Sequence, residues 1–320
     1  MTCNRRTATV ALLAGLGMAG ARAQAQQVTK FVTGSAPGGG TDVLTRLLAE
    51  HMGHAMGRTI IVENKPGASY NIAADHVAKA APDGLTALVT FNVHPIAGAL
   101  HPQLPFDPVT SFAAVGIIAT TPYALVATPT LPGAHLKEVL TLAKSQGRSL
   151  SFASIGIGTP QHLMLERLKQ QTGVDIRMAH YKNASVGQTD VAAGHVDFTL
   201  STIAFCEPLV RAGRMKVLAV TSPQRLPQLP DAPTIDELGY KGFVTDGWYA
   251  MLLPARTPPE IVKRYNDALN QVLADPAVLQ KFKAANLVAT RGTPQVLDRQ
   301  IREDAAMWKK VITEQGIKPE

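Results

Sequence analysis

Residues 28–57 read VTKFVTGSAPGGGTDVLTRLLAEHMGHAMG and combine three kinds of local sequence. A short apolar strand comes first, a glycine-rich turn follows, and a helix with one apolar stripe comes last. Such a stripe is typical of a helix that packs on a sheet, and its members are Val43, Leu44, Leu47, Leu48 and Met52. Gly57 then ends the helix, because glycine readily adopts the left-handed conformation that closes helices. The stretch therefore predicts a strand–turn–helix unit.

The same unit recurs in residues 149–173, where SLSFAS is a strand, IGIGTP a glycine turn and QHLMLERLKQQTG a helix. Strands and helices alternate through most of the chain, which predicts sheets with helices on both faces. We expect an α/β protein with two lobes, each a mainly parallel sheet flanked by helices, and a ligand cleft between the lobes. Residues 26–124 and 247–320 are expected to form lobe 1, and residues 125–246 lobe 2.

The composition is that of a folded protein. Of 320 residues, 46% are hydrophobic and 17% are charged, which excludes a disordered chain. Only two cysteines are present, Cys3 and Cys206, so a disulfide-stabilised scaffold is excluded. Prolines interrupt the apolar runs within residues 84–106 and 109–136, and we interpret these runs as buried strands rather than membrane spans.

The N-terminus has the three parts of a secretory signal peptide. Two arginines precede an uncharged run over residues 7–21, and small residues follow. Cleavage after Ala23 or after Ala25 fits this pattern equally well. Removing residues 1–25 takes away three arginines and no acid, so the net charge falls from +7 to +4. The mature chain is expected to be secreted, and its mild charge does not predict a nucleic-acid partner.

The two glycine turns are the candidate binding sites. In the first, residues 34–42, unpaired backbone N–H groups at the start of a helix carry the positive end of the helix dipole, which attracts anions. The second turn, residues 154–160, has the same design, with Thr159 as its N-cap and Pro160 at the first helical position. If the lobes face each other, a small carboxylate bridges both helix N-termini. The expected ligand-binding residues of the turns are Ser35, Pro37, Gly38, Gly39, Gly40, Thr41, Asp42, Ser154, Gly156, Gly158 and Thr159.

Several single side chains have more than one interpretation. Asp42 either contacts the ligand or complements the helix dipole. Tyr70 either stacks on the ligand or covers an apolar rim. Asn92 lies at the end of a strand, where ligands bind in α/β sheets, and it is either a ligand contact or a structural residue. Phe205 is expected in the core rather than in a pocket wall.

Familiar cofactor and catalytic motifs are not matched. The first turn is similar to a P-loop, but Gly40 stands in place of the phosphate-binding lysine, and neither turn fits GxGxxG. His51 and His54 lack a third zinc ligand at matching spacing, so we expect neither a metal nor a cofactor. No GxSxG elbow surrounds Ser154. An enzyme is not expected; the alternatives are a secreted serine-dependent hydrolase using Ser35 or Ser154, and an extracellular sensor or adaptor.

Several longer motifs follow one another along the chain. They include GSAPGGGTDVLTRLLAEHM, LPFDPVTSFAAVG, SFASIGIGTPQHL, MKVLAVTSPQRLPQLPDAPTIDELG and GWYAMLLPARTPPEIV. In these motifs the chain resembles the Bug family, the periplasmic solute-binding receptors of tripartite tricarboxylate transporters, from about Val28 to Lys318. The resemblance implies a two-lobe periplasmic binding protein fold that closes on a small carboxylated solute. It also implies membrane transporter subunits as partners, and we expect a monomer.

The resemblance further implies roles for single residues. Asn92 matches the family's asparagine after the third strand, and His162 matches its histidine in GTxxHL. Ser69-Tyr70 stand where the family has two glycines, and Ser201-Thr202 stand where it has Asp-Asn. We expect carboxylate capture to survive these departures and side-chain selectivity to change. Tyr70, Asn92, His162 and Thr202 therefore join the expected ligand-binding residues.

Overall fold

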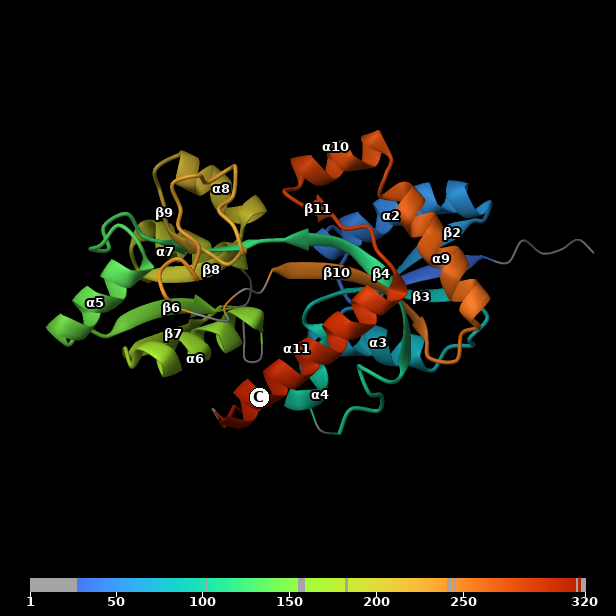
Figure 1. The fold of residues 1–320 in the computed structure, drawn as a ribbon, viewed down its shortest axis with the longest axis horizontal. Coiled ribbons are helices and arrows are strands. Elements are labelled where there is room, and N and C mark those ends of the chain that lie inside the picture. The colour runs from blue at the N-terminus through green and yellow to red at the C-terminus, as the bar shows by residue number, and fades with distance from the viewer. Residues whose placement is uncertain are drawn as a thin grey trace, which may run out of the picture.

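The computed structural model describes residues 28–101, 103–154, 159–181, 184–240, 243, 246–314 and 316–317. They form two lobes side by side, each built on one β-sheet (Figure 1). The expected signal peptide and both cleavage positions lie outside the described residues. Among the helices of the described part, none is both long and apolar enough to cross a membrane.

The sheet of lobe 1 has the strand order β11-β4-β10-β3-β1-β2. β1 pairs in parallel with β2 and β3, whereas β10 lies antiparallel between β3 and β4. Alternate residues of a strand face opposite sides, so Phe31 and Val32 of β1 pack in different core clusters. The strands are β1 (Thr29–Thr33), β2 (Ile60–Asn64), β3 (Thr86–Phe91), β4 (Phe112–Thr121), β10 (Gly247–Pro254) and β11 (Val288–Ala289).

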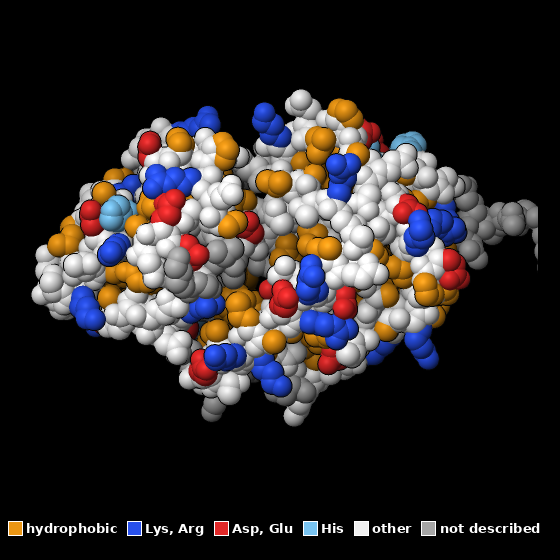
Figure 2. All heavy atoms as spheres, viewed as in Figure 1, with side chains coloured by type: hydrophobic (Ala, Val, Ile, Leu, Met, Phe, Trp, Pro, Cys, Tyr) orange, Lys and Arg blue, Asp and Glu red, His pale blue; other side chains and the backbone are white. Residues whose placement is uncertain are grey.

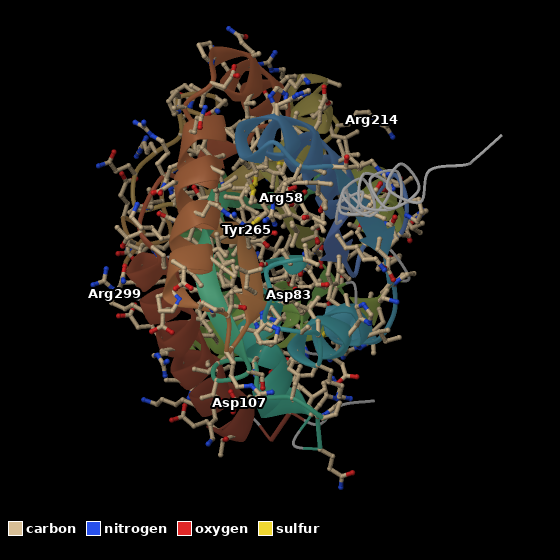
Figure 3. The ribbon with its side chains drawn as sticks, turned by 90° about the vertical axis from the view of Figure 1, so that its right-hand side faces the viewer. Arg58, Asp83, Asp107, Arg214, Tyr265 and Arg299 are labelled. Atoms are coloured by element: carbon tan, nitrogen blue, oxygen red, sulfur yellow. The ribbon has the colours of Figure 1, made fainter. Side chains whose placement is uncertain are left out.

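Helices cover both faces of this sheet. α2, α9 and α10 pack on one face, and α3 and α11 pack on the other. Tyr265 of α9 points into the centre of lobe 1, where its hydroxyl donates to the Gly84 carbonyl at 2.6 Å (Figure 3). The helical segments are α2 (Gly40–Met56), η1 (Ala68–Tyr70), α3 (Asn71–Ala78), η2 (His94–Ile96), α4 (Ala97–Leu100), α9 (Pro259–Val272), α10 (Pro276–Ala284) and α11 (Pro294–Glu314).

The sheet of lobe 2 has the strand order β7-β6-β8-β5-β9. α5 and α6 pack in the core cluster on one face, and α7 and α8 contribute to the cluster on the other. The strands are β5 (Tyr123–Ala127), β6 (Leu150–Ser154), β7 (Ile176–His180), β8 (Phe198–Thr202) and β9 (Lys216–Val220). The helices are α5 (Leu136–Gln146), α6 (Pro160–Thr172), α7 (Ala184–Ala193) and α8 (Ile203–Arg211).

Both sheets are mixed, which corrects the expectation of mainly parallel sheets. β5 pairs antiparallel with both β8 and β9, and β10 pairs antiparallel with both β3 and β4. These strands belong to the segments that cross between the lobes (Figure 1). Only Pro122 separates β4 from β5, so the chain passes directly from the sheet of lobe 1 into the sheet of lobe 2.

Two side contacts also join the lobes. On one side, Leu163 of α6 packs with Ile96 and with Trp308 of α11 in one apolar cluster. On the other side, the Asn286 amide, just beyond α10, donates to a carboxylate oxygen of Glu207 on α8 at 3.1 Å. The crossing strands and these contacts together connect the two lobes on either side of the space between them.

Candidate functional site

The first glycine turn ends in a helix N-terminus with free donors. Gly39 is the N-cap of α2, and its N–H donates to the Ala36 carbonyl at 3.0 Å. Within the described residues, no acceptor takes the N–H groups of Gly40, Thr41 and Asp42. These three donors lie at the positive end of a 17-residue helix, so the position favours an anion.

Asp42 holds this turn in place. Its side chain is 1% exposed, and its carboxylate accepts bonds from the Gly38 N–H at 2.8 Å, from Arg46 Nε at 3.0 Å and from Asn64 Nδ2 at 2.7 Å. Burial raises the pKa of Asp42, but the bonds from Arg46, Asn64 and Gly38 outweigh it and hold the pKa below its ordinary value. The carboxylate is thus engaged within the protein, and the backbone N–H is the group of Asp42 that is open to a ligand.

Tyr70 joins the first turn to the end of β3. Its hydroxyl and the Thr41 hydroxyl are hydrogen bonded at 3.1 Å, and its ring packs edge-on against Phe91 with centroids 4.7 Å apart. A Cβ at Gly34 would lie 2.5 Å from the Tyr70 ring, so only glycine allows this approach. Tyr70 therefore lies beside the anion-favouring turn, and its contact with a ligand stays a prediction.

Two buried side chains at the ends of β3 and β4 each have a polar atom without a partner in the described residues, and Thr121, but not Asn92, lines the cavity between the lobes. Asn92 is 4% exposed and Thr121 is 3% exposed. Among the described residues, neither Asn92 Oδ1 nor Thr121 Oγ1 has a hydrogen-bond partner. The Asn92 side chain approaches the hydroxyl of Tyr123. Residue Tyr123 of β5 lies opposite Thr202 of the neighbouring strand β8. Because buried polar groups are normally paired, these two atoms mark a place where a polar ligand group fits.

A cavity of about 570 Å³ lies between the lobes at this point. Gly40 and Thr121 line it from lobe 1, and Thr202 and Phe205 line it from lobe 2. Figure 2 shows the hollow between the lobes at the upper edge of the view, with hydrophobic and basic side chains around it. The cavity brings the first turn and the end of β8 into one crevice, and its size suits a small molecule.

Of the second turn, the structure describes Ser154 at the end of β6 and Thr159 and Pro160 at the start of α6. Thr159 is the N-cap and its hydroxyl accepts the His162 N–H at 3.3 Å, with Pro160 at the first helical position, which confirms that part of the prediction. Ser154 ends β6 and is 1% exposed. Burial lowers the pKa of His162, whose ring lies 3.9 Å from Glu166. Gly156 and Gly158 lie outside the described residues.

Three residues that line the cavity are not among the expected ligand contacts: Phe205, Thr121 and Tyr249. Phe205 is 57% exposed and lines the cavity, so its expected place in the core is wrong. α8 turns its other face to lobe 2, where Ile203 and Cys206 are buried. Thr121 and Tyr249 also line the cavity; Thr121 belongs to none of the quoted motifs, and Tyr249 lies in GWYAMLLPARTPPEIV without being an expected ligand contact. The one signal for Thr121 is its position at the end of a strand, just before Pro122.

Comparison with known proteins gives the family. Residues 44–317 match the model of the TctC family, the tripartite tricarboxylate transporter family receptor. The chain belongs to this receptor family. Protein BugT of Bordetella pertussis is 31% identical over 284 residues, which cover 88% of this chain and 87% of BugT.

Two solved structures support the same assignment. The periplasmic binding protein BugD is 31% identical with a TM-score of 0.77, over 92% of this chain and 99% of BugD. The R. palustris protein Rpa4515, solved with adipate, is 32% identical with a TM-score of 0.79, over 93% of this chain and 100% of that one. The predicted family and the two-lobe periplasmic binding protein fold are thus confirmed. The family and these neighbours are solute-binding receptors rather than enzymes.

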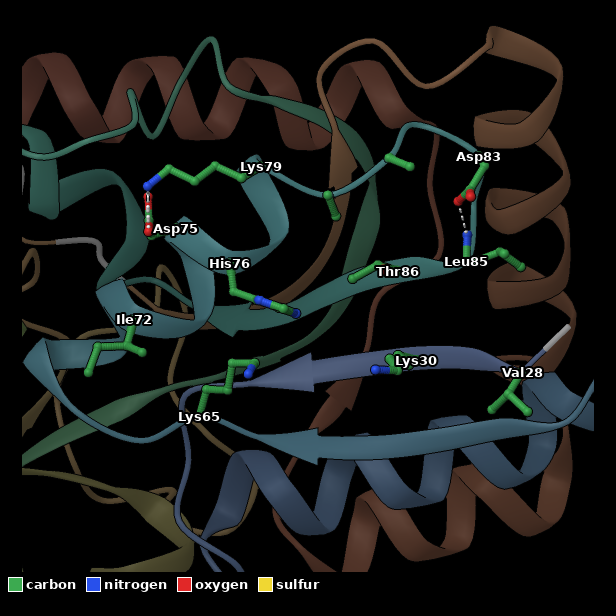
Figure 4. Close-up of a pocket in the computed structure, with 12 residues that line it drawn as sticks. Val28, Lys30, Lys65, Ile72, Asp75, His76, Lys79, Asp83, Leu85 and Thr86 are labelled. Atoms are coloured by element: carbon green, nitrogen blue, oxygen red, sulfur yellow. Dashed lines mark hydrogen bonds and ion pairs between the residues drawn. The ribbon is translucent and has the colours of Figure 1, made fainter.

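A second hollow in this receptor-family chain lies on lobe 1, away from the crevice. Its volume is about 670 Å³, and it is lined by α3 and the strands beside it (Figure 4). Each of its lysines is paired with an acid: Lys30 and Lys65 with Glu63 at 3.2 and 2.7 Å, and Lys79 with Asp75 at 2.7 Å. The crevice, with its free N–H groups and unpaired polar atoms, is therefore the better candidate.

Proposed function

We propose that this chain is a periplasmic receptor that captures a small organic carboxylate between its lobes and delivers it to the membrane subunits of a tripartite tricarboxylate-type transporter. The observation that supports it most is the set of free N–H groups of Gly40, Thr41 and Asp42 at the start of α2, where Gly40 lines a cavity shared with Thr202 of the other lobe. Family membership and the adipate-bound neighbour favour the same ligand chemistry.

Micromolar affinity requires ligand contacts from both lobes. Three charge-assisted hydrogen bonds contribute about 5–9 kcal/mol before costs. Association costs at least about 4 kcal/mol, whereas micromolar affinity needs about 8 kcal/mol net. The first turn alone is therefore too weak, and we assign the remaining contacts to Asn92 and to the lobe 2 residues Ser154, Thr159, His162 and Thr202. Gly156 and Gly158 belong to the same proposal.

The rest of the proposal follows from this role. The N-terminal 25 residues serve as the export signal, and the expected lobes, residues 26–124 with 247–320 and residues 125–246, close against each other as two bodies. We place the boundary between them at Pro122, because β5 begins at Tyr123 in the sheet of lobe 2. The receptor acts as a monomer, without a cofactor, and catalyses no reaction. Of the two serines in the hydrolase alternative, Ser35 donates a hydrogen bond from its hydroxyl to the Ala36 carbonyl at 3.2 Å.

Gly40→Glu tests the site directly. A Cβ at Gly40 meets nothing within 4 Å, so the larger side chain fits without strain, and it enters the cavity that Gly40 lines. An acid in the first helical turn also stabilises a helix by about 0.3–1 kcal/mol. We expect the variant to unfold at the same or a higher urea concentration, while its affinity for carboxylates, measured by isothermal titration calorimetry, falls about 100-fold, as expected for a loss of about 3 kcal/mol.

Gly40→Ala is the matched control. It adds a side chain at the same position without a charge, so we expect carboxylate affinity to stay within a few-fold of the unmodified protein. Unchanged affinity in Gly40→Glu would show that the start of α2 is not the site.

A further inference from the structure

The cavity between the lobes continues from the polar end into an apolar channel along α2. The α2 residues that line it run from Gly40 to Glu50, a distance of about 15 Å along the helix axis at 1.5 Å per residue. Most of the walls beyond Gly40, Thr121 and Thr202 are apolar. They come from both lobes and from α10, and they include Val43, Leu44, Leu47, Phe205, Phe282 and Leu287.

Two of these wall residues are exposed to an unusual degree. Val43 is 59% exposed on α2, and Phe205 is 57% exposed on α8 of the other lobe. Both line the same cavity. Large apolar side chains that gather on an open surface mark a place where an apolar group binds, and here they lie on opposite sides of the crevice.

We infer that the solute is a monocarboxylate with an apolar tail, such as a medium-chain alkanoate, whose head lies at Gly40 and whose tail lies between Val43 and Phe205. This inference rests on the proposed carboxylate capture. The unpaired Thr121 hydroxyl, in a residue 3% exposed, lines the cavity with Gly40 and gives the head a second polar contact. The tail then covers the exposed wall residues.

A second carboxylate fits this channel poorly. Beyond the polar end, it would lose its hydration against Leu47, Phe282 and Leu287. Two basic residues also line the channel. Arg46 is engaged by Asp42 and Asn64, and Lys281 is an exposed residue of α10. A dicarboxylate as short as malate or as long as adipate is therefore expected to bind less tightly than a monocarboxylate of equal length.

The test is a calorimetric series on the purified protein with butanoate, hexanoate, octanoate and decanoate, and with dicarboxylates of the same lengths. Each methylene that enters the channel should tighten binding about four-fold until the cavity is full. The dicarboxylates should bind at least about ten-fold more weakly than their monocarboxylate partners, because a second carboxylate gives up hydration against the apolar walls, where Arg46 is already engaged by Asp42.

Variants of the two exposed wall residues locate the tail. Val43→Ser and Phe205→Ser should each weaken octanoate binding about ten-fold and weaken butanoate binding less, since more methylenes of the longer tail contact these two walls. The control is Leu279→Ser. Leu279 is an exposed residue of α10 that does not line the cavity, so this variant should change the affinity for neither octanoate nor butanoate. Both wall residues are largely exposed, so these variants should fold normally.

The outcomes separate the two proposals. If short acids bind and Gly40→Glu abolishes their binding, but chain length has no effect or dicarboxylates bind as tightly as monocarboxylates, the tail inference is wrong and the receptor function stands. If octanol binds as tightly as octanoate, or if no acid of either series binds, carboxylate capture itself is wrong.

Discussion

Single residues show which parts of the site can be predicted from sequence. Glycines mark the first turn because few other residues allow a close approach of chains, as Gly34 does beneath Tyr70. Asn92 is predictable from its place after a strand. Phe205 is not, because whether an aromatic residue on an amphipathic helix is covered depends on the distant segments that pack opposite it, here α2 and α10.

His94 gives the protein a residue-level sensitivity to acid. His94 is 3% exposed, its ring packs with those of Phe106 and Phe112, and Nε2 donates to the Pro108 carbonyl at 2.9 Å. Burial lowers the pKa of His94 to about 4 from 6.5. Between pH 6.5 and pH 4, His94 binds a proton in the unfolded chain but not in the folded chain. The free energy of unfolding therefore decreases as the pH falls through this range.

We therefore expect His94 to remove about 3 kcal/mol of unfolding free energy between pH 6.5 and pH 4. His94→Gln, which keeps a donor but does not titrate, should be less stable at pH 7 and lose correspondingly less on acidification. Urea unfolding of both proteins at a series of pH values measures this difference. Parallel pH dependences would show that His94 is not the cause.

At the scale of elements, the order of strands and helices is predictable and the direction of some strands is not. Apolar runs, glycine ends and the Asp275–Pro276 break define each element locally, and the structure has α10 beginning at Pro276 with Asp275 as its N-cap. Strand direction in β5 and β10 depends instead on how the chain crosses between two sheets. That is a property of the whole path, so the mixed sheets could not be predicted from local pattern.

The element η1 is strained, and the strain can be relieved. Ala68, Ser69 and Tyr70 have φ of 43°, 51° and 74°, all in the left-handed region. A non-glycine residue there costs about 1–2 kcal/mol, while a glycine costs about 0.4–1 kcal/mol more in chain entropy. The Ser69 side chain is exposed, so Ser69→Gly should raise the unfolding free energy by about 0.5–1 kcal/mol, measured by urea unfolding.

The matched control for η1 is Ser145→Gly, at an exposed serine inside α5. Glycine in a helix is less favourable than serine, so this variant should lose a few tenths of a kcal/mol. Two variants of the same kind are then expected to change stability in opposite directions. A loss of stability in Ser69→Gly would mean that the left-handed backbone of η1 carries no strain.

At the scale of the whole molecule, the lobes are connected unequally on their two sides. α11 packs on α6 through an apolar cluster, whereas α10 and α8 meet through the polar contact of Asn286 with Glu207. The cavity is lined by the same two helices, α10 and α8. Opening on that side breaks one hydrogen bond, while opening on the α11 side would expose apolar surface. The crevice is therefore expected to open at Asn286.

Asn286→Asp should favour the open form. Asparagine has φ of 51° here, a conformation that aspartate also tolerates, so the backbone can stay as it is. The new carboxylate faces Glu207 across 3.1 Å, where like charges at a surface repel by about 1–4 kcal/mol. We expect a larger radius of gyration in small-angle scattering without solute and about ten-fold weaker solute binding, which corresponds to about 1.4 kcal/mol. Asn286→Gly removes the bond without adding a charge, so it should weaken binding less; equal radii and affinities in all three proteins would show that this contact does not hold the lobes together.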